Sequence, residues 1–311
     1  MKISVVLSAY NGAEYITEQL DSIRNQSRPA DEVLIFDDVS TDNTVEIVRE
    51  YIKKYNLSSW RLYENKENYG WKKNFMFGMN MSSGDLIFSA DQDDIWMPEK
   101  FEIMHRIMSE NSDINVLASA LEEFFDDGHT NVMKEKKDTE LVKLSFNKKI
   151  FDIKYPGCTY CIRGEFFKEC MPLWRETFPH DAMLWRNAII SDSLAICNTP
   201  LIKWRKHNDS AYSVEARKGK SKTEKIKWTF YAEENIEQLE NYIKNKKGEI
   251  KNFHKKTVLL KKYRRWIILR RKFYKTKNIF YGIKLLGYMG FYVRFRQYLG
   301  DWYITYFKGD K

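Results

Sequence analysis

The sequence predicts an α/β fold, with helices on both faces of a mainly parallel central sheet, followed by a C-terminal helical region. Over residues 1–110, short apolar runs alternate with segments of helical periodicity. Polar side chains stand where each apolar run ends, and beyond residue 216 the sequence becomes helical and basic. Alternating strands and helices favour a parallel sheet, whose strand ends share an edge at which ligands bind.

Each element of the alternation can be assigned from its pattern. Short runs rich in apolar residues, the first of them also rich in β-branched residues, indicate four strands, at residues 2–10, 31–38, 60–65 and 85–90. Apolar residues at helical spacing indicate the helices between them, at residues 12–27, 40–55 and 70–82. A further helix is expected directly after Asp94, with Asp94 as its cap and Pro98 in its first turn.

The pattern is less regular after residue 120. The expected elements there are a hairpin at 122–140, a strand running into a helix at 160–171, a helix at 180–190, two edge strands at 193–207 broken at Pro200, and a basic linker at 213–225. Two or three long helices follow. We therefore expect a domain at 1–215, with halves at about 1–110 and 111–215, and a helical region at 216–311.

Composition excludes several classes of protein. The chain has 311 residues, of which 43 % are hydrophobic, so it can bury a sizeable core. Its four cysteines are too few for a disulfide scaffold, and the C-x-x-C at Cys158 and Cys161 lacks the second pair or the histidines of a zinc site. No apolar run is long enough for a transmembrane helix, and the N-terminus lacks a signal-peptide pattern, so a cytoplasmic location is expected.

Positive charge is concentrated at the C-terminus. The formal net charge is +9, yet residues 251–311 alone contain 17 Lys and Arg, two acids and 16 aromatic residues. Cations interleaved with aromatic rings suit an anionic membrane surface, at the inner face of the cell membrane. A helical cap with a solvated basic face and a nucleic-acid surface are the alternatives, of which we disfavour nucleic acid. The same segment could instead form a homodimer interface.

Polar residues follow four successive strands of the predicted sheet. They are Ser8 to Asn11, Asp37 and Asp38, Glu64 to Gly70, and Asp91 to Asp93. An Asp-x-Asp pair suits Mg²⁺ or Mn²⁺, which prefer carboxylate ligands and commonly bridge to substrate phosphates. The alternative for these carboxylates is helix capping. Neither G-x-G-x-x-G after the first strand nor a P-loop motif occurs, which disfavours a dinucleotide oxidoreductase and a P-loop NTPase.

These motifs resemble the family 2 glycosyltransferases, which have the GT-A fold. The segments are ISVVLSAYNGAEYITEQLDSIRNQS, VLIFDDVSTDNT, NYGWKKNF, GDLIFSADQDDIWMPEKF, PGCTYCIRGEFF, PHDAMLW and WRKHNDS, in the order typical of that family. The resemblance covers about residues 1–210, so it makes 1–110 the nucleotide-binding half and 111–215 the acceptor half. The DQDDIW form is most similar to bacterial rhamnosyltransferases of surface-polysaccharide synthesis.

The resemblance implies a role for each candidate residue. Asp181 would be the catalytic base, and Asp93 with Asp91 would hold the metal. Nucleotide-sugar contacts would come from Ala9, Tyr10, Asn11, Asp38, Asn68, Gly70, Asn74, Asp91, Gln92, Arg205 and His207. For Asp181, at the start of an apolar helix, capping is the alternative from the residues alone.

The resulting hypothesis is a metal-dependent inverting glycosyltransferase. It would move rhamnose from dTDP-rhamnose to a glycan or a lipid-linked acceptor. The alternative donors are a UDP-hexose and UDP-galactofuranose. Two other classes are a nucleotidyltransferase, which would normally carry a basic glycine-rich loop after the first strand, and a non-catalytic membrane-binding scaffold.

Overall fold

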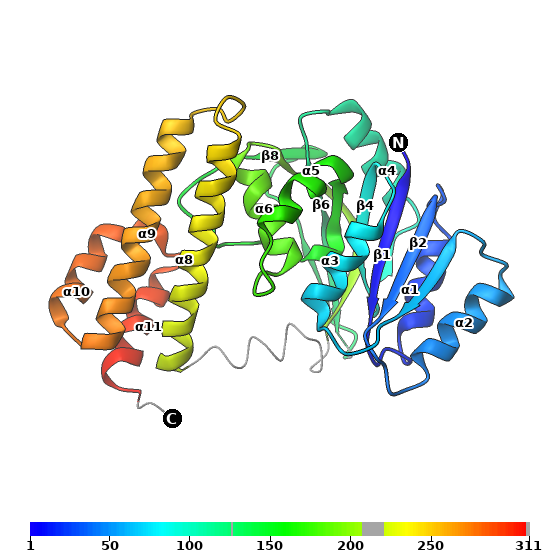
Figure 1. The fold of residues 1–311 in the computed structure, drawn as a ribbon, viewed down its shortest axis with the longest axis horizontal. Helices are drawn as coiled ribbons and strands as arrows, with labels where there is room; N and C mark the ends of the chain where they lie inside the picture. Colours follow the sequence, from blue (N-terminus) through cyan, green and yellow to red (C-terminus); the bar gives the residue numbers. More distant parts are fainter. Residues whose placement is uncertain (126, 207–220, 309–311) are drawn as a thin grey trace. The chain divides into compact units, whose positions relative to one another are not determined.

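A computed structural model describes residues 1–125, 127–206 and 221–308 (Figure 1). The chain divides into two compact units. The first comprises Met1–Leu144 and Lys154–Lys206, and the second joins Ser145–Ile153 to the chain beyond Lys206. The expected boundary at 215 and most of the expected linker at 213–225 lie outside the described residues.

The first unit is built on a ten-stranded sheet of order β3-β2-β1-β4-β9-β6-β10-β5, with β7 paired to β6 and β8 to β10. Pairs β1–β2, β2–β3 and β1–β4 are parallel, as expected for the nucleotide-binding half. The pair β6–β10 is also parallel, whereas β9 runs antiparallel to its neighbours β4 and β6. The strands are β1 (Ile3–Ala9), β2 (Glu32–Asp37), β3 (Trp60–Glu64), β4 (Leu86–Asp91), β5 (Ile95–Trp96), β6 (Val116–Phe125), β7 (Thr130–Met133), β8 (Leu141–Leu144), β9 (Tyr160–Arg163) and β10 (Leu194–Lys206).

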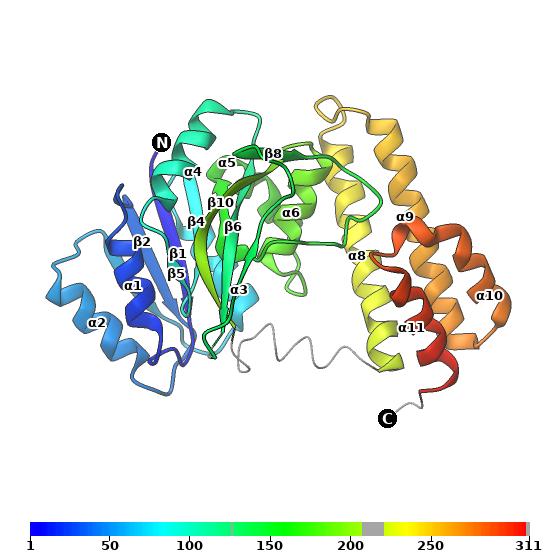
Figure 2. The same ribbon diagram turned by 180° about the vertical axis from the view of Figure 1, so that it is seen from behind.

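Helices cover both faces of this sheet, as predicted. Helices α3 and α6 lie on one face, and α1 and α4 lie on the other (Figures 1 and 2). The helices of the first unit are α1 (Ile16–Arg24), α2 (Thr44–Lys54), α3 (Trp71–Met81), α4 (Lys100–Glu110), α5 (Gly164–Cys170) and α6 (His180–Ile190), with short 3₁₀ turns η1 (Gly157–Thr159) and η2 (Met171–Leu173).

Sheet register brings the polar strand ends into one row. Ala9 of β1 lies opposite Asp37 of β2, and Asp37 lies opposite Glu64 of β3. On the other side of β1, Ser8 lies opposite Asp91 of β4. The apolar residues that precede them are buried, because helices cover the sheet above and below. The carboxyl ends of the parallel strands therefore share one edge, where open α/β sheets bind their ligands.

Two sequence-based expectations are wrong. Residues 194–206 form the single strand β10, which lies between β6 and β5, and the chain accommodates Pro200 by shifts of register against β6. The helix expected after Asp94 begins only at Lys100, because residues 95–96 instead form β5 and pair with β10. Asp94 therefore caps no helix. The expected hairpin is confirmed as β6 and β7.

The second unit is helical, as expected. It contains α8 (Lys222–Asn245), α9 (Phe253–Thr276), α10 (Ile279–Lys284), the 3₁₀ segment η3 (Leu285–Phe291) and α11 (Phe295–Tyr306). Helices α8 and α9 run side by side (Figure 1). Aromatic rings fill the core, so part of the aromatic content of the tail is structural: Tyr242, Tyr263, Trp266, Phe273, Tyr274, Phe291, Tyr292 and Tyr298 are buried. Among the described residues, no helix is both long and apolar enough to span a bilayer.

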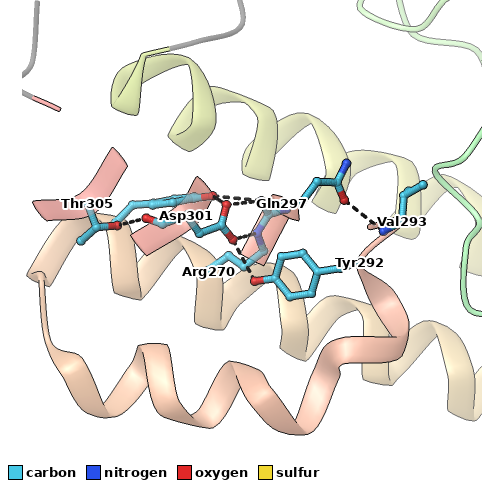
Figure 3. Close-up of polar contacts among 7 residues, drawn as sticks. Arg270, Tyr292, Val293, Gln297, Asp301 and Thr305 are labelled. Carbon is cyan, nitrogen blue, oxygen red and sulfur yellow. Dashed lines mark hydrogen bonds and ion pairs between the residues drawn. The ribbon is translucent and has the colours of Figure 1, made fainter. Parts of the chain in front are cut away.

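One buried ion pair fixes α11 to α9. Arg270 donates two hydrogen bonds of 2.8 Å to the carboxylate of Asp301, which also accepts hydrogen bonds from the hydroxyls of Tyr274 and Tyr292 (Figure 3). The guanidinium lies 4.8 Å from the ring centre of Trp266. Every charge in this cluster has its partners, so the cluster can be buried without a ligand.

Candidate active site

Acidic groups gather where β4 ends. Among the described residues, Asp91, Asp94 and Cys158 place possible ligand atoms within 4.8 Å of one another. Asp91 is the last residue of β4 and is half-buried, whereas Asp94 is fully buried three residues later. Cys158 comes from η1, the turn that precedes β9, and is also buried. The chain thus places a half-buried carboxyl, a buried carboxyl and a buried thiol together at the ligand-binding edge of the sheet.

The charges of this cluster oppose one another. Burial, and then the charges of Asp93 and Asp181, raise the pKa of Asp91 to about 7. Burial and the neighbouring carboxylates also raise the pKa of Asp94 well above its usual range. The pKa of the Cys158 thiol is raised as well, so this group stays protonated. Four acids converge here, and a cation would relieve their repulsion.

The donor set fits a hard divalent cation. Its charged ligand atoms are carboxylate oxygens, which Mg²⁺ and Mn²⁺ prefer, and a protonated thiol is a poor ligand for either. The expected pair was Asp91 and Asp93. Within the described residues, the structure groups Asp91 with Asp94, while Asp93 adds its charge from nearby. The backbone oxygen of Asp93 accepts a hydrogen bond of 2.9 Å from Arg205.

Asp181 approaches this cluster from α6. It is the second residue of that helix, and its Oδ1 accepts a hydrogen bond of 2.6 Å from the amide of Ala182. Its charge also contributes to the raised pKa of Asp91. Gly157 permits this approach, because a Cβ there would lie 2.7 Å from Nε2 of His180 and 3.0 Å from Cβ of Asp181. The hydrogen bond to Ala182 occupies only one carboxylate oxygen.

Trp96 and Lys100 pack next to residues 91–94, which we call the acidic segment. Trp96 is buried and packs against the rings of Phe88 and Phe101. The ammonium of Lys100 lies 4.6 Å from the Trp96 ring centre and donates a 3.2 Å hydrogen bond to the carbonyl of Cys158. Burial lowers the pKa of Lys100 to about 8. The buried ammonium of Lys100 thus lies near these carboxyl groups and is hydrogen-bonded to the turn that carries Cys158.

Side-chain hydrogen bonds fix the conformation of the loop after β1, residues 10–13. Gln92 accepts a hydrogen bond of 2.8 Å from the amide of Tyr10 and donates one of 2.9 Å to its carbonyl. A Cβ on Gly12 would lie 2.2 Å from the Gln92 amide oxygen, which explains the glycine. Asn11 takes a positive φ of 48° and accepts from the amide of Thr41. The predicted ligand Gln92 therefore positions the loop, while the Tyr10 ring is 48 % exposed at the edge.

Asp38 organises the loop after β3. Its carboxylate is buried and accepts hydrogen bonds from the amides of Tyr69 and Gly70 and from the side chain of Asn65. Its amide donates a 2.8 Å hydrogen bond to the carbonyl of Ala9. Gly70 has a φ of 79°, a conformation that favours glycine. Asp38, predicted to contact the nucleotide sugar, thus fixes the shape of the loop at this edge of the sheet.

Asn68 and Asn74 link the same loops. Asn68 donates a hydrogen bond of 2.9 Å to the carbonyl of Asp38. Asn74, at 1 % exposure, donates to Oγ of Ser8 and to the carbonyl of Phe36, and accepts from Asn65. Both predicted sugar or diphosphate ligands lie at the expected edge, where they join β1, β2 and the loop before α3. Asn65 is the residue of this network that sequence reasoning missed.

Arg205 is bound to the acidic segment. Its amide donates a hydrogen bond of 3.1 Å to Oδ1 of Asp94, and its guanidinium forms an ion pair with Glu18. The guanidinium also lies 4.6 Å from the ring centre of Tyr15 and 4.5 Å from that of Phe124. In this conformation Arg205 clamps the turn from β4 to β5. The other predicted residue of its loop, His207, lies outside the described residues.

The structure thus brings the carboxylates of Asp91, Asp93 and Asp181 together, with Arg205 tied to their segment. Sequence reasoning missed Asp94, Cys158 and Lys100 as members of this site. Lys100 could have been found, because it occupies the buried face of α4, in helical register with Met104 and Ile107. Cys158 had no such signal, since a buried thiol in a core has the same pattern. All four cysteines are buried thiols outside any disulfide, as expected.

Comparisons with known proteins show to which family this chain belongs. The model of glycosyl transferase family 2 matches residues 4–173, more than half of the chain. A UDP-Gal:alpha-D-GlcNAc-diphosphoundecaprenol beta-1,3-galactosyltransferase of Escherichia coli is 30 % identical over 56 % of this chain and 66 % of its own length. The dTDP-rhamnosyl transferase RfbG of Shigella flexneri is 31 % identical over 51 % of this chain and 54 % of its own. This chain thus spans less than two-thirds of the length of these relatives.

A solved structure shares the fold. The Staphylococcus aureus TarS fragment 1–349 in complex with UDP-GlcNAc aligns with a TM-score of 0.63, over 97 % of this chain and 78 % of that fragment. The identity is 19 %, so the likeness concerns the fold alone. It supports the predicted GT-A architecture. On the extent of the family match, this chain belongs to glycosyl transferase family 2.

Proposed function

We propose that this protein is a metal-dependent inverting glycosyltransferase whose donor is a nucleoside diphosphate sugar. One observation carries the proposal beyond family membership. Asp181, on α6, lies against Gly157 of η1, the turn that also carries Cys158 of the acidic cluster, and its charge adds to the raised pKa of Asp91. A proton acceptor thus stands beside a site fit for a cation, at the edge where such a sheet binds ligands.

Asp91 and Asp93, with Asp94 beside them, would hold Mg²⁺ or Mn²⁺. When bound, the cation supplies positive charge that stabilises the leaving diphosphate. The raised pKa values of Asp91 and Asp94 support the assignment, because a cation would return these carboxyls to their ionised form. Lys100, behind the segment, supplies too little positive charge to balance the acids alone.

Asp181 would act as the general base. The acceptor hydroxyl oxygen attacks the anomeric carbon, its proton passes to the Asp181 carboxylate, and the bond from that carbon to the diphosphate oxygen breaks with inversion. Because Oδ1 of Asp181 accepts from Ala182, the proton would pass to Oδ2. The same hydrogen bond fixes the orientation of the carboxylate.

The proposed donor is dTDP-rhamnose. Support comes from the DQDDIW segment and from the Shigella flexneri relative, which is named a dTDP-rhamnosyl transferase. A UDP-hexose is the second candidate, favoured by the Escherichia coli relative, whose name specifies UDP-Gal. The loops around Tyr10 and Asp38 would receive the nucleotide in either case, with Arg205 and His207 near the diphosphate.

The proposed acceptor is a glycan or a lipid-linked sugar in cell-surface polysaccharide synthesis. The Escherichia coli relative, whose name includes an acceptor on diphosphoundecaprenol, supports the lipid-linked class. An acceptor of this kind resides in a membrane, so we place the enzyme at the inner face of the cell membrane. The basic residues of 251–311 support that location.

A donor panel tests the proposal. Thermal shift is measured with dTDP-rhamnose, UDP-galactose, UDP-galactofuranose and free UDP, each with Mg²⁺, with Mn²⁺ and with EDTA. A ligand that binds only the folded state raises the melting temperature, by an amount that grows with its concentration. We expect the largest shift with dTDP-rhamnose and metal. A larger shift with a UDP-sugar would reassign the donor, and no shift with any nucleotide would refute the proposed function.

A further inference from the structure

Helix α11 is apolar on two opposite sides. Tyr298, Asp301, Ile304 and Thr305 face the core of the second unit and are buried. Phe295, Leu299, Tyr303 and Phe307 recur every fourth residue, and each is at least half exposed, Phe307 to 79 %. Residues four apart stack along one face of a helix. A surface helix of a soluble domain normally presents charged or polar residues there.

Helix α10 and the start of η3 repeat the pattern. Ile279, Ile283 and Leu286 are each about half exposed and follow helical spacing, and the neighbouring Phe280 is 68 % exposed. The two helices pack together, since a Cβ on Gly282 would lie 2.4 Å from the Trp302 ring. We call the exposed set the α10–α11 apolar surface, which comprises Ile279, Phe280, Ile283, Leu286, Phe295, Leu299, Tyr303 and Phe307.

This surface is presented by a fixed scaffold. The Arg270–Asp301 pair joins α9 to α11 in the core, and Tyr292, just after η3, donates to the same carboxylate (Figure 3). The hydroxyl of Tyr298 in α11 also donates to the carbonyl of Gly282 in α10. The inner sides of both helices are therefore already packed, and the exposed apolar side chains are surplus to the folding of this unit.

The exposed charges of the segment that carries this surface, residues 277–308, are all positive. Residues 277–308 contain Lys277, Lys284, Arg294, Arg296 and Lys308, all exposed. Their one acid, Asp301, is buried and paired with Arg270. A symmetric dimer through this surface would set the cations of one copy against those of the other. An anionic bilayer, in contrast, attracts the cations and accepts the apolar side chains.

We propose that the α10–α11 apolar surface binds anionic lipid bilayers. Its phenylalanine and aliphatic side chains enter the boundary between headgroups and acyl chains, Tyr303 lies in the headgroup layer, and the flanking cations meet the lipid phosphates. The proposal narrows the membrane contact from the whole of residues 251–311 to one surface. It does not rest on the proposed reaction, because binding needs neither donor nor acceptor.

Vesicle flotation with the full-length protein tests the proposal. One vesicle type contains phosphatidylglycerol mixed with phosphatidylcholine, and the other contains phosphatidylcholine only. We expect the protein to float with the anionic vesicles and to be released from them as salt rises, because screening weakens the electrostatic part. A protein that stays soluble with both vesicle types at low salt would overturn the proposal.

Variants separate the apolar and the electrostatic contributions. Phe280→Asn combined with Phe307→Asn should lower partition into anionic vesicles at least tenfold. Arg294→Gln combined with Arg296→Gln should lower it by about fivefold per cation, chiefly at low salt. The control is Val132→Asn, which changes a half-exposed apolar side chain in the first unit and should leave partition unchanged. All these side chains are exposed, so each variant should melt like the parent.

Other occupants would give different results. If the chain sediments as a dimer that the Phe280→Asn, Phe307→Asn variant dissociates, and vesicle partition is the same for parent and variant, the surface joins two copies and the proposal fails. If single-stranded DNA binds to the parent but not to this variant, while anionic vesicles bind both equally, the surface serves nucleic acid and the proposal also fails.

Discussion

Asp91 and Asp94 in the first unit and Asp301 in the second are carboxyl groups held wholly or partly away from water. Asp301 has a compensating cation, Arg270, whereas Asp91 and Asp94 lie among other carboxyl groups. Asp301 has a guanidinium and two tyrosine hydroxyls around it. Asp91 and Asp94 instead have other carboxylates near them, and their pKa values rise accordingly. A complete cluster stabilises the fold, whereas an incomplete one lowers stability until a ligand supplies the missing charge. The comparison predicts opposite responses to substitution.

The largest expected effect concerns Asp181. Asp181→Asn keeps the shape of the side chain but removes the proton acceptor, so kcat should fall by about 10²–10⁴. Donor affinity should change little, because the base acts on the acceptor. The measurement pairs initial rates of sugar transfer with donor titration by calorimetry.

The control is Glu165→Gln, which alters an exposed carboxylate in the first turn of α5. It should leave kcat unchanged. Full transfer activity in Asp181→Asn would remove Asp181 from the role of base and leave capping of α6 as its function.

The complete cluster should respond through stability. Arg270→Met leaves the Asp301 carboxylate buried without its cation, and breaking a buried pair in this way costs about 3–5 kcal/mol. The matched control on the same helix is Arg264→Met, which breaks a half-exposed pair with Glu240 and should cost about 0–1 kcal/mol. Urea unfolding followed by circular dichroism gives both values. Equal losses in the two variants would show that the buried pair has no special role.

How far the sequence predicts these clusters depends on whether their signals are local. The apolar run of β4 ending in Asp91 is a local pattern, and it predicted the edge of the sheet at which the acidic residues gather. Asp94 and Pro98 have the local pattern of a helix start, but the pairing of residues 95–96 with β10, which is distant in sequence, overrode it. The clamp by Arg205 and the approach of Cys158 arise from the same kind of long-range pairing. Likewise, helical periodicity could not tell which apolar side of α11 would be buried.

The incomplete cluster should respond in the opposite sense. Asp91→Asn removes a charge that burial and its neighbours disfavour, so in EDTA at pH 8 the variant should melt higher than the parent, by about 2–4 °C for each 1 kcal/mol gained. Because burial and nearby charge raise the folded-state pKa of Asp91 to about 7, parental stability should fall as pH rises from about 4 to 7. The variant should lose part of that decline.

With metal and donor present, the ranking of parent and variant should reverse. The parent gains stability from ligand binding, whereas Asp91→Asn should gain little. Glu64→Gln, at the exposed end of the edge strand β3, serves as the control and should follow the parent in both conditions. If Asp91→Asn melts lower than the parent in EDTA, the carboxylate stabilises the empty site and the contrast between the two clusters is lost.

The smallest expected effect concerns the ion pair between Glu18 and Arg205. The Glu18 side chain is 57 % exposed and that of Arg205 is 14 % exposed. Glu18→Gln should therefore cost no more than about 1 kcal/mol in urea unfolding, the usual range for such pairs. Arg205 would keep its position through its hydrogen bond to the Asp93 carbonyl and its contacts with the rings of Tyr15 and Phe124.

The same variant tests whether Arg205 binds the donor. If Arg205 binds the donor diphosphate, releasing it from Glu18 should also lower the KM for the donor. An unchanged KM would leave Arg205 as a clamp on the acidic segment, and a loss of several kcal/mol would make this pair part of the fold, like that of Arg270.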